Sequence, residues 1–150
     1  MKQAVALVSV PLILFCGTAT ANCGAGSKTI FSCLTSSAKR IEVCDSRKTI
    51  DYTFGKPNDR PEIAIRAPRS DTSTYQWAGF GRGRTYSVSV PNGNTTYTVF
   101  YSWDSMNPNA DPESGVEVEV DKKVVATVKC SRKSKITHDL EGIDLKPSER

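Results

Sequence analysis

Histidine is the side chain most often used as a catalytic base, and this chain has one, His138, next to Asp139 in a polar C-terminal stretch. A hydrolytic triad needs a base beside its nucleophile. The sequence contains neither a G-x-S-x-G nor an H-E-x-x-H motif. We therefore expect His138 to be a solvated tail residue, and we assign no catalytic residue.

Carboxylates could act in pairs as the acid and base of glycoside cleavage. Asp51, Glu62 and Asp104 are the candidates, while Glu117 and Glu119 alternate with valines. That alternation is typical of the solvated face of an amphipathic strand. Since spacing singles out no pair, the sequence predicts a protein that is not an enzyme.

Cysteines are the other chemically active group, and four of the five lie beyond the N-terminal apolar run, at Cys23, Cys33, Cys44 and Cys130. An even number in an exported chain predicts two disulfides. Of the three possible pairings we favour Cys33 with Cys44 and Cys23 with Cys130. Zinc sites usually contain close C-x-x-C pairs, which are missing here, so we expect no metal and no cofactor.

A glycine-rich turn at 79–84 combines arginines with aromatic residues. Its G-x-G-x-G pattern is not the G-x-G-x-x-G of dinucleotide sites. Arginine and aromatic residues are enriched at binding hot spots, so we predict a partner-binding site made of Trp77, Phe80, Arg82 and Arg84. The alternative is an ordinary tight strand connection in which glycine supplies positive φ.

Aromatic residues also suggest a second kind of site. Tyr75, Trp77, Tyr101 and Trp103 could form a platform on which sugar rings stack, which would make the chain a glycan or peptidoglycan-binding module. In a small β domain most such rings are needed in the core. The platform therefore requires that at least two of the rings be coplanar and exposed.

The N-terminal segment predicts the compartment. Met1–Ala21 has Lys2 as its only charge, a short apolar run, and the small residues Ala19-Thr20-Ala21. This is the pattern of a secretory signal peptide, cleaved before Asn22, so we expect a periplasmic or secreted protein. No later stretch approaches the roughly 20 apolar residues of a membrane span. The net charge of +4 falls to +3 without Lys2, which does not call for a nucleic-acid partner.

These residues must be positioned by strands, because the apolar period from Lys28 onward is two. The pattern predicts strands flanked by turn residues, at 28–35, 40–45, 49–54, 62–67, 85–90, 95–103, 116–120 and 124–130. The turn 91–94, with its Asn-Gly pair, predicts one hairpin. A three-residue turn at 121–123 predicts another, with Val120 facing Val124 and Val118 facing Ala126.

The remaining segments are polar. We expect a linker at 69–73, an exposed loop at 104–114, and a loosely attached polar tail at 131–150. Residues 22–130 then form one domain, a disulfide-stapled antiparallel β-sandwich or small β-barrel of about eight or nine strands.

The strand motifs resemble those of an uncharacterised family of small exported bacterial envelope β proteins. The similarity covers roughly 30–130 and rests on fold motifs, which are Phe31-Ser32-Cys33, 39–45, 49–55, 86–93 and 125–130. The aromatic-x-Cys first strand is also distantly similar to the periplasmic or membrane-bound C-type lysozyme inhibitors. That resemblance implies an eight-stranded barrel and an inhibitory Ser-Gly-x-x-Tyr loop. Here Ser114-Gly115 is followed by Val118 where the tyrosine would stand.

Export, disulfides, a compact β scaffold and the lack of a catalytic motif together predict a binding protein. We expect its partner to be a protein, specifically a cell-wall hydrolase or toxin against which the chain acts as an inhibitor or immunity protein. A rigid sheet would present the 79–84 turn or the 104–114 loop to that partner.

Overall fold

The computed structural model describes residues 23–148, which form two β-sheets packed face to face as a sandwich. The predicted signal peptide lies outside the described residues. No helix occurs between residues 23 and 148, so this part of the chain contains no helical segment that could cross a membrane. Neither sheet closes on itself, and the architecture is therefore the sandwich rather than the barrel.

The first sheet has the order β10-β1-β2-β3-β4, and every neighbouring pair is antiparallel. Its strands are β1 (Lys28–Leu34), β2 (Arg40–Asp45), β3 (Thr49–Gly55), β4 (Ile63–Pro68) and β10 (Thr137–His138). The four long strands lie within two residues of the predicted ranges, because their apolar alternation and their turn residues are both local signals.

The second sheet has the order β11-β5-β6-β7-β8-β9. Its strands are β5 (Ser73–Gln76), β6 (Gly83–Asn92), β7 (Thr95–Asp104), β8 (Glu113–Val120), β9 (Lys123–Lys129) and β11 (Lys146–Pro147). The strand β5 was not predicted, and it begins at Ser73, the last residue of the predicted linker. Its Thr74 is buried although polar, because the hydroxyl donates to the carbonyl of Ser87 at 2.6 Å.

The core lies between the two sheets and is built from alternating residues of the central strands. Its fully buried members include Ile41, Val43, Ile50, Tyr52, Val88, Val90, Val99 and Val116. On β6 the alternating residues Tyr86, Val88 and Val90 are all buried. The alternation therefore does set which face of the strand packs inward.

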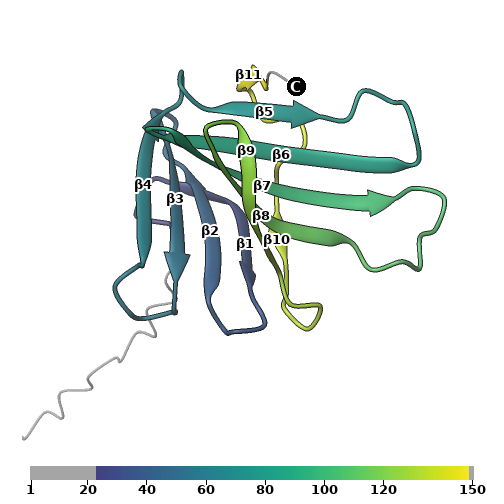
Figure 1. The fold of residues 1–150 in the computed structure, drawn as a ribbon, viewed down its shortest axis with the longest axis horizontal. Helices are drawn as coiled ribbons and strands as arrows, with labels where there is room; N and C mark the ends of the chain where they lie inside the picture. Colours follow the sequence, from purple (N-terminus) through teal and green to yellow (C-terminus); the bar gives the residue numbers. More distant parts are fainter. Residues whose placement is uncertain (1–22, 149–150) are drawn as a thin grey trace, which may run out of the picture.

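The strands of the two sheets cross rather than run side by side (Figure 1). The far ends of β6 and β7, together with their loops, consequently extend beyond the first sheet. Crossed packing of this kind covers the middle of each sheet and leaves corners open. The overhanging corner carries the aromatic residues discussed below.

The disulfides join Cys23 with Cys44 and Cys33 with Cys130. Two disulfides are compatible with an oxidising compartment, but the favoured pairing was wrong. Cys33 and Cys44 sit on paired strands without facing each other, because Cys33 pairs with Ile41 and Cys44 with Thr29. The Cys33–Cys130 bond instead links the two sheets, beside an isolated bridge between Thr35 and Cys130.

The segment after Cys130 is not loosely attached. Its β10 pairs with β1, its β11 runs parallel to β5, and Leu140 between them is 0% exposed within the core. Gln76 holds the crossing chain with both ends of its amide, donating to the Leu140 carbonyl and accepting from the Gly142 N–H, each at 2.8 Å.

The last hairpin also differs from its predicted register. Its turn has two residues, Asp121 and Lys122, both with positive φ, as in the tight hairpin turns favoured by strand twist. Val120 therefore pairs with Lys123, and a bulge restores the predicted pairing of Val118 with Ala126. Val124 and Val125, at the bulge, are 56% and 61% exposed.

Candidate functional site

Two loops meet at the overhanging end of the second sheet. They are the β5–β6 connection at 77–82 and the β7–β8 connection at 105–112, and they lie together because Gly83 pairs with Asp104 where β6 and β7 end. The two loops that the sequence offered as alternative binding elements therefore form a single surface. We call it the loop end.

Polar contacts lock these two loops to each other. Arg82 donates from Nε and Nη2 to the two carboxylate oxygens of Asp104, at 3.2 and 2.5 Å. Ser105 donates from its backbone N–H and from its hydroxyl to the Arg82 carbonyl, both at 2.8 Å. The hydrogen bond from Arg82, followed by that from the Met106 N–H, lowers the pKa of Asp104 below its usual value. The clamp therefore holds the carboxylate ionised and the loop backbone in place.

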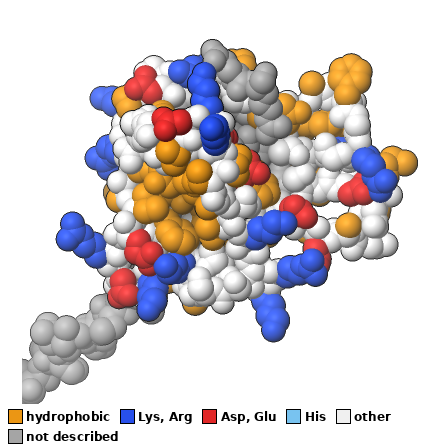
Figure 2. All heavy atoms as spheres, in the orientation of Figure 1, with side chains coloured by type: hydrophobic (Ala, Val, Ile, Leu, Met, Phe, Trp, Pro, Cys, Tyr) orange, Lys and Arg blue, Asp and Glu red, His pale blue; other side chains and the backbone are white. Residues whose placement is uncertain are grey.

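Two large apolar side chains project from the loop end. Phe80 is 87% exposed and Met106 is 76% exposed. Figure 2 shows hydrophobic side chains at the right-hand extremity of the molecule, beside neighbouring basic and acidic groups. Single exposed apolar residues are common on protein surfaces, but these two lie on adjacent loops that are joined by Arg82, Asp104 and Ser105.

Behind the loops, a row of aromatic rings and the Arg84 guanidinium lies on the inner face of the second sheet. The Arg84 guanidinium lies over the ring of Trp77 at 4.4 Å and near that of Trp103 at 6.0 Å. Trp103 packs against Tyr86 and Tyr101, with ring centroids 5.6 Å apart in each case. The row exists because residues on one face of β6 and β7 are cross-strand neighbours, as in the pairing of Arg84 with Trp103.

Arg84 makes fewer polar contacts than its position suggests. Its Nε is buried without a hydrogen-bond partner. A cation over an aromatic ring contributes about 0.5 to 2 kcal/mol, whereas a buried donor without an acceptor costs about 1 to 3 kcal/mol. The stabilisation from the ring contacts is therefore smaller than, or at most similar to, the cost of burying the unsatisfied N–H.

His138 is solvent-exposed, as expected, but its segment is not a loose tail, because its ring joins this row. Its ring stacks on that of Tyr101, with centroids 3.7 Å apart and planes inclined by 14°. Burial lowers the pKa of His138 below its ordinary value, and Asp139 and Glu141 oppose that shift. The adjoining Glu141 accepts a hydrogen bond of 2.9 Å from the Tyr86 hydroxyl, so this part of the C-terminal segment is tied to the row.

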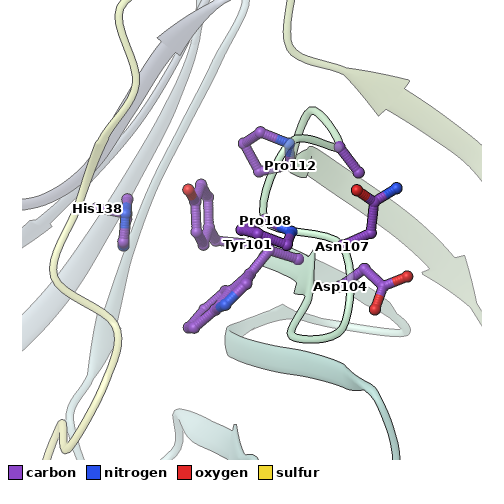
Figure 3. Close-up of a pocket in the computed structure, with 8 residues that line it drawn as sticks. Tyr101, Asp104, Asn107, Pro108, Pro112 and His138 are labelled. Atoms are coloured by element: carbon purple, nitrogen blue, oxygen red, sulfur yellow. The ribbon is translucent and has the colours of Figure 1, made fainter.

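A pocket of about 250 Å³ opens between this row and the β7–β8 loop. It is lined by Tyr101, Trp103, Asp104, Asn107, Pro108, Ala110, Pro112 and His138. Figure 3 shows the rings on one side and the prolines on the other, with the polar ends of Asp104 and Asn107 turned away from Tyr101. The pocket is therefore mainly a slot between rings and prolines, about the size of one small cyclic group.

The four predicted partner-binding residues all lie at or behind the loop end, in different roles. Trp77 and Arg84 stack, and the Trp77 indole N–H donates to the Phe80 carbonyl at 2.8 Å. Phe80 projects outward, whereas Arg82 pairs with Asp104. Sequence reasoning included Met106 only as part of the 104–114 loop and assigned no role to His138. Met106 lies near the 79–84 turn because Gly83 pairs with Asp104. No local signal in the sequence indicates that His138 stacks on Tyr101.

The predicted ring platform for sugars is not flat. Tyr101 and Trp103 are inclined by 51° and both are only partly exposed. Trp77 carries the Arg84 guanidinium over its ring at 4.4 Å, so that face of the indole is already occupied. Tyr75 lies on β5, partly exposed.

The candidate carboxylates are engaged in ion pairs. Asp51 pairs with Arg66, Glu62 with Lys39, and Asp104 with Arg82. Glu117 and Glu119 lie on β8 and are partly exposed.

One cysteine cluster has ligand-like spacing. The sulfurs of Cys23 and Cys44 and the Glu42 carboxylate lie within 4.8 Å of one another. Those two sulfurs are joined in a disulfide and cannot act as thiolate ligands.

Ser114 and Gly115, the dipeptide expected in an inhibitory loop, are instead buried in β8. Comparisons of the chain with protein-family models, with curated proteins and with solved structures found no match.

Proposed function

We propose that this chain is a non-enzymatic protein-binding protein of the periplasm, acting as an inhibitor or immunity protein against a cell-wall hydrolase or toxin. The observation that carries the proposal is the exposure of Phe80 and Met106 on two adjacent loops that are clamped by Arg82 and Asp104. The signal-like N-terminus and the two disulfides support the compartment.

Rigidity supports this proposal. Binding has to overcome the ordering of interface loops, and a surface that is already ordered loses less entropy on association. At the loop end Ser105 and Asp104 each bond to Arg82 across the two loops. Apolar anchors surrounded by a polar rim are the usual composition of a binding hot spot.

The test uses the double variant Phe80→Ala, Met106→Ala. Immobilised protein is exposed to a periplasmic extract, retained proteins are identified, and each is purified and titrated against the wild-type protein and the variant. We expect one partner with peptidoglycan hydrolase activity, inhibition of that activity by the wild-type protein, and affinity reduced at least about 100-fold by the double variant.

The matched control is Val125→Ala, which removes an exposed apolar side chain from β9 at the other end of the second sheet. It should bind like the wild-type protein. The proposal is wrong if no purified hydrolase or toxin binds, or if the loop-end variant and the control bind equally well.

A glycan or peptidoglycan-binding function is the second candidate, favoured by the pocket beside Tyr101 and Trp103. Rings and a cavity of this size suit a single sugar. Two observations rank it lower: the rings are tilted, and Asp104 is already bonded to Arg82. Titration with soluble peptidoglycan fragments, followed by tryptophan fluorescence, distinguishes the two functions, because a Trp103→Phe variant should reduce the response only if sugars bind there.

A further inference from the structure

Arg84 differs from the other arginines that the sandwich holds in ion pairs. Arg66, Arg69 and Arg82 each pair with an aspartate. Arg84 has two aromatic neighbours, and among residues 23–148 no carboxylate lies within ion-pair distance of its guanidinium. Its Nε is moreover buried and without an acceptor.

Polar groups of the same row make hydrogen bonds with residues other than Arg84. Glu141 accepts from the Tyr86 hydroxyl, and the Trp77 indole N–H donates to the Phe80 carbonyl. The guanidinium lies over the Trp77 ring at 4.4 Å, and the Trp103 ring is farther away, at 6.0 Å. Nε itself is buried, but the residue as a whole is only partly buried, so solvent reaches other atoms of the side chain. The site is thus a cation that is positioned by aromatic rings and is open to solvent on part of its surface.

We infer that Arg84 binds a carboxylate supplied by the partner protein, beside Trp77 and behind the loops that carry the Phe80 and Met106 anchors. This inference rests on the proposed function and names the chemistry of the partner. A guanidinium is a planar fork of N–H donors that matches the two oxygens of a carboxylate. Because its ring contacts already position the Arg84 guanidinium, the side chain loses little conformational freedom when it binds a carboxylate.

Charge complementarity selects this occupant. Within the described residues Arg84 has no ion-pair partner, whereas the nearby Arg82 is neutralised by Asp104. One guanidinium matches one monovalent carboxylate, whereas a phosphate carries nearly two charges and usually binds several donors. The exposed apolar side chains Phe80 and Met106 fit a protein surface around that acidic group.

The first experiment needs no partner. The Nε–Hε resonance of Arg84 is followed by NMR while the full mature chain is titrated with sodium acetate at constant ionic strength. Two further arms use N-acetylaspartate amide, which presents a side-chain carboxylate, and N-acetylalanine, which presents a chain-terminal one. Inorganic phosphate and sodium chloride complete the set. Arg82, whose Nε already donates to Asp104, is the internal reference in the same spectra.

We expect a saturable shift of the Arg84 resonance with the carboxylates and no saturable shift of the Arg82 resonance. The better of the two amino-acid probes identifies the source as an acidic side chain or a chain terminus. A shift that does not saturate, or one that phosphate saturates at lower concentration than acetate, overturns the inference.

The second experiment uses Arg84→Lys, which keeps the charge but removes the planar fork. Acetate should then no longer perturb the indole N–H resonances of Trp77 and Trp103, and affinity for the purified partner should fall at least about tenfold. Arg66→Lys, on the first sheet, is the matched control and should change neither. Equal affinity of the Arg84→Lys variant and the wild-type protein overturns the inference.

The two proposals fail separately. If a hydrolase binds through Phe80 and Met106 while carboxylates do not shift Arg84, the carboxylate site is wrong and the proposed function stands. If carboxylates bind at Arg84 but no hydrolase or toxin is retained, the proposed function is wrong and the carboxylate site stands.

Discussion

His138 shows how the surroundings of one side chain replace what its sequence neighbours suggest. In the chain it stands among polar residues, yet in the fold its ring lies on Tyr101 because β10 pairs with β1. Burial against that ring disfavours the charged imidazolium, and the pKa of His138 falls below its ordinary value of 6.5. Arg84 shows the same principle, since its tryptophan neighbours come from different segments.

The titration of His138 can be measured directly because the chain has one histidine. Its NMR midpoint should lie below 6.5, and Tyr101→Ala should move it toward 6.5 by restoring solvent. Since folding lowers this pKa, the stability that neutral His138 contributes is fully present above pH 6.5. It is lost as the pH falls through the folded-state pKa.

The control for that measurement is Phe80→Ala, which alters an exposed loop tip and should leave the midpoint unchanged. A midpoint at or above 6.5 in the wild-type protein, or no change in Tyr101→Ala, would show that stacking does not determine the protonation of His138.

At the scale of elements, hairpins were predicted well and their registers less well. The alternation of apolar residues and the flanking turn residues identified β1, β2, β3, β4, β6, β7, β8 and β9. The strands β5, β10 and β11 escaped prediction because they have four residues or fewer, and the partners of β10 and β11 moreover lie far away in the chain. A short strand has too few positions to show a period, so only its partner defines it.

The two disulfides should contribute unequally to stability. The Cys33–Cys130 bond spans 97 residues and the Cys23–Cys44 bond spans 21. In the chain-entropy model, closing the longer loop stabilises the fold by about 5 kcal/mol and the shorter by about 3 kcal/mol. Replacing both cysteines of a pair by alanine should therefore lower the urea midpoint more for Cys33 and Cys130. An equal or larger loss for the other pair would contradict this order.

Gly115 is required where β8 and β9 approach each other. A Cβ built there would lie 2.2 Å from the Val128 carbonyl oxygen and 2.9 Å from the Lys129 Cα, both backbone atoms that cannot move independently. Gly115→Ala should destabilise the protein by about 2 kcal/mol or more in urea unfolding. Gly83→Ala on β6, where a Cβ meets no atom within 4 Å, is the matched control. A similar effect of the two substitutions would contradict the steric explanation.

At the scale of the whole molecule, the C-terminal segment completes the sandwich. It runs from the first sheet, at β10, to the second, at β11, and inserts Leu140 between them. It also supplies His138 and Glu141 to the row behind the loop end. The candidate site therefore depends on residues that the sequence assigned to a loose tail.

Leu140→Ala should leave a cavity in the core and lower the free energy of unfolding by about 2 to 5 kcal/mol. Leu34→Ala, at a position 37% exposed, should cost much less, because little of that side chain leaves water on folding. Chemical denaturation of both variants provides the comparison. If they are equally stable, the C-terminal segment does not belong to the cooperative core.

The sequence by itself determined the all-β class, most strand positions, the residues of the 79–84 turn and the presence of two disulfides. These features follow from local causes: an apolar period of two, turn residues, and the number of cysteines. Only the tertiary structure decided the cysteine pairing, the sandwich over the barrel, the convergence of the two loops, the burial of Leu140 and the stacking of His138 on Tyr101. Each of these depends on which distant segments pack together, and packing between distant segments leaves no periodic signal in the chain.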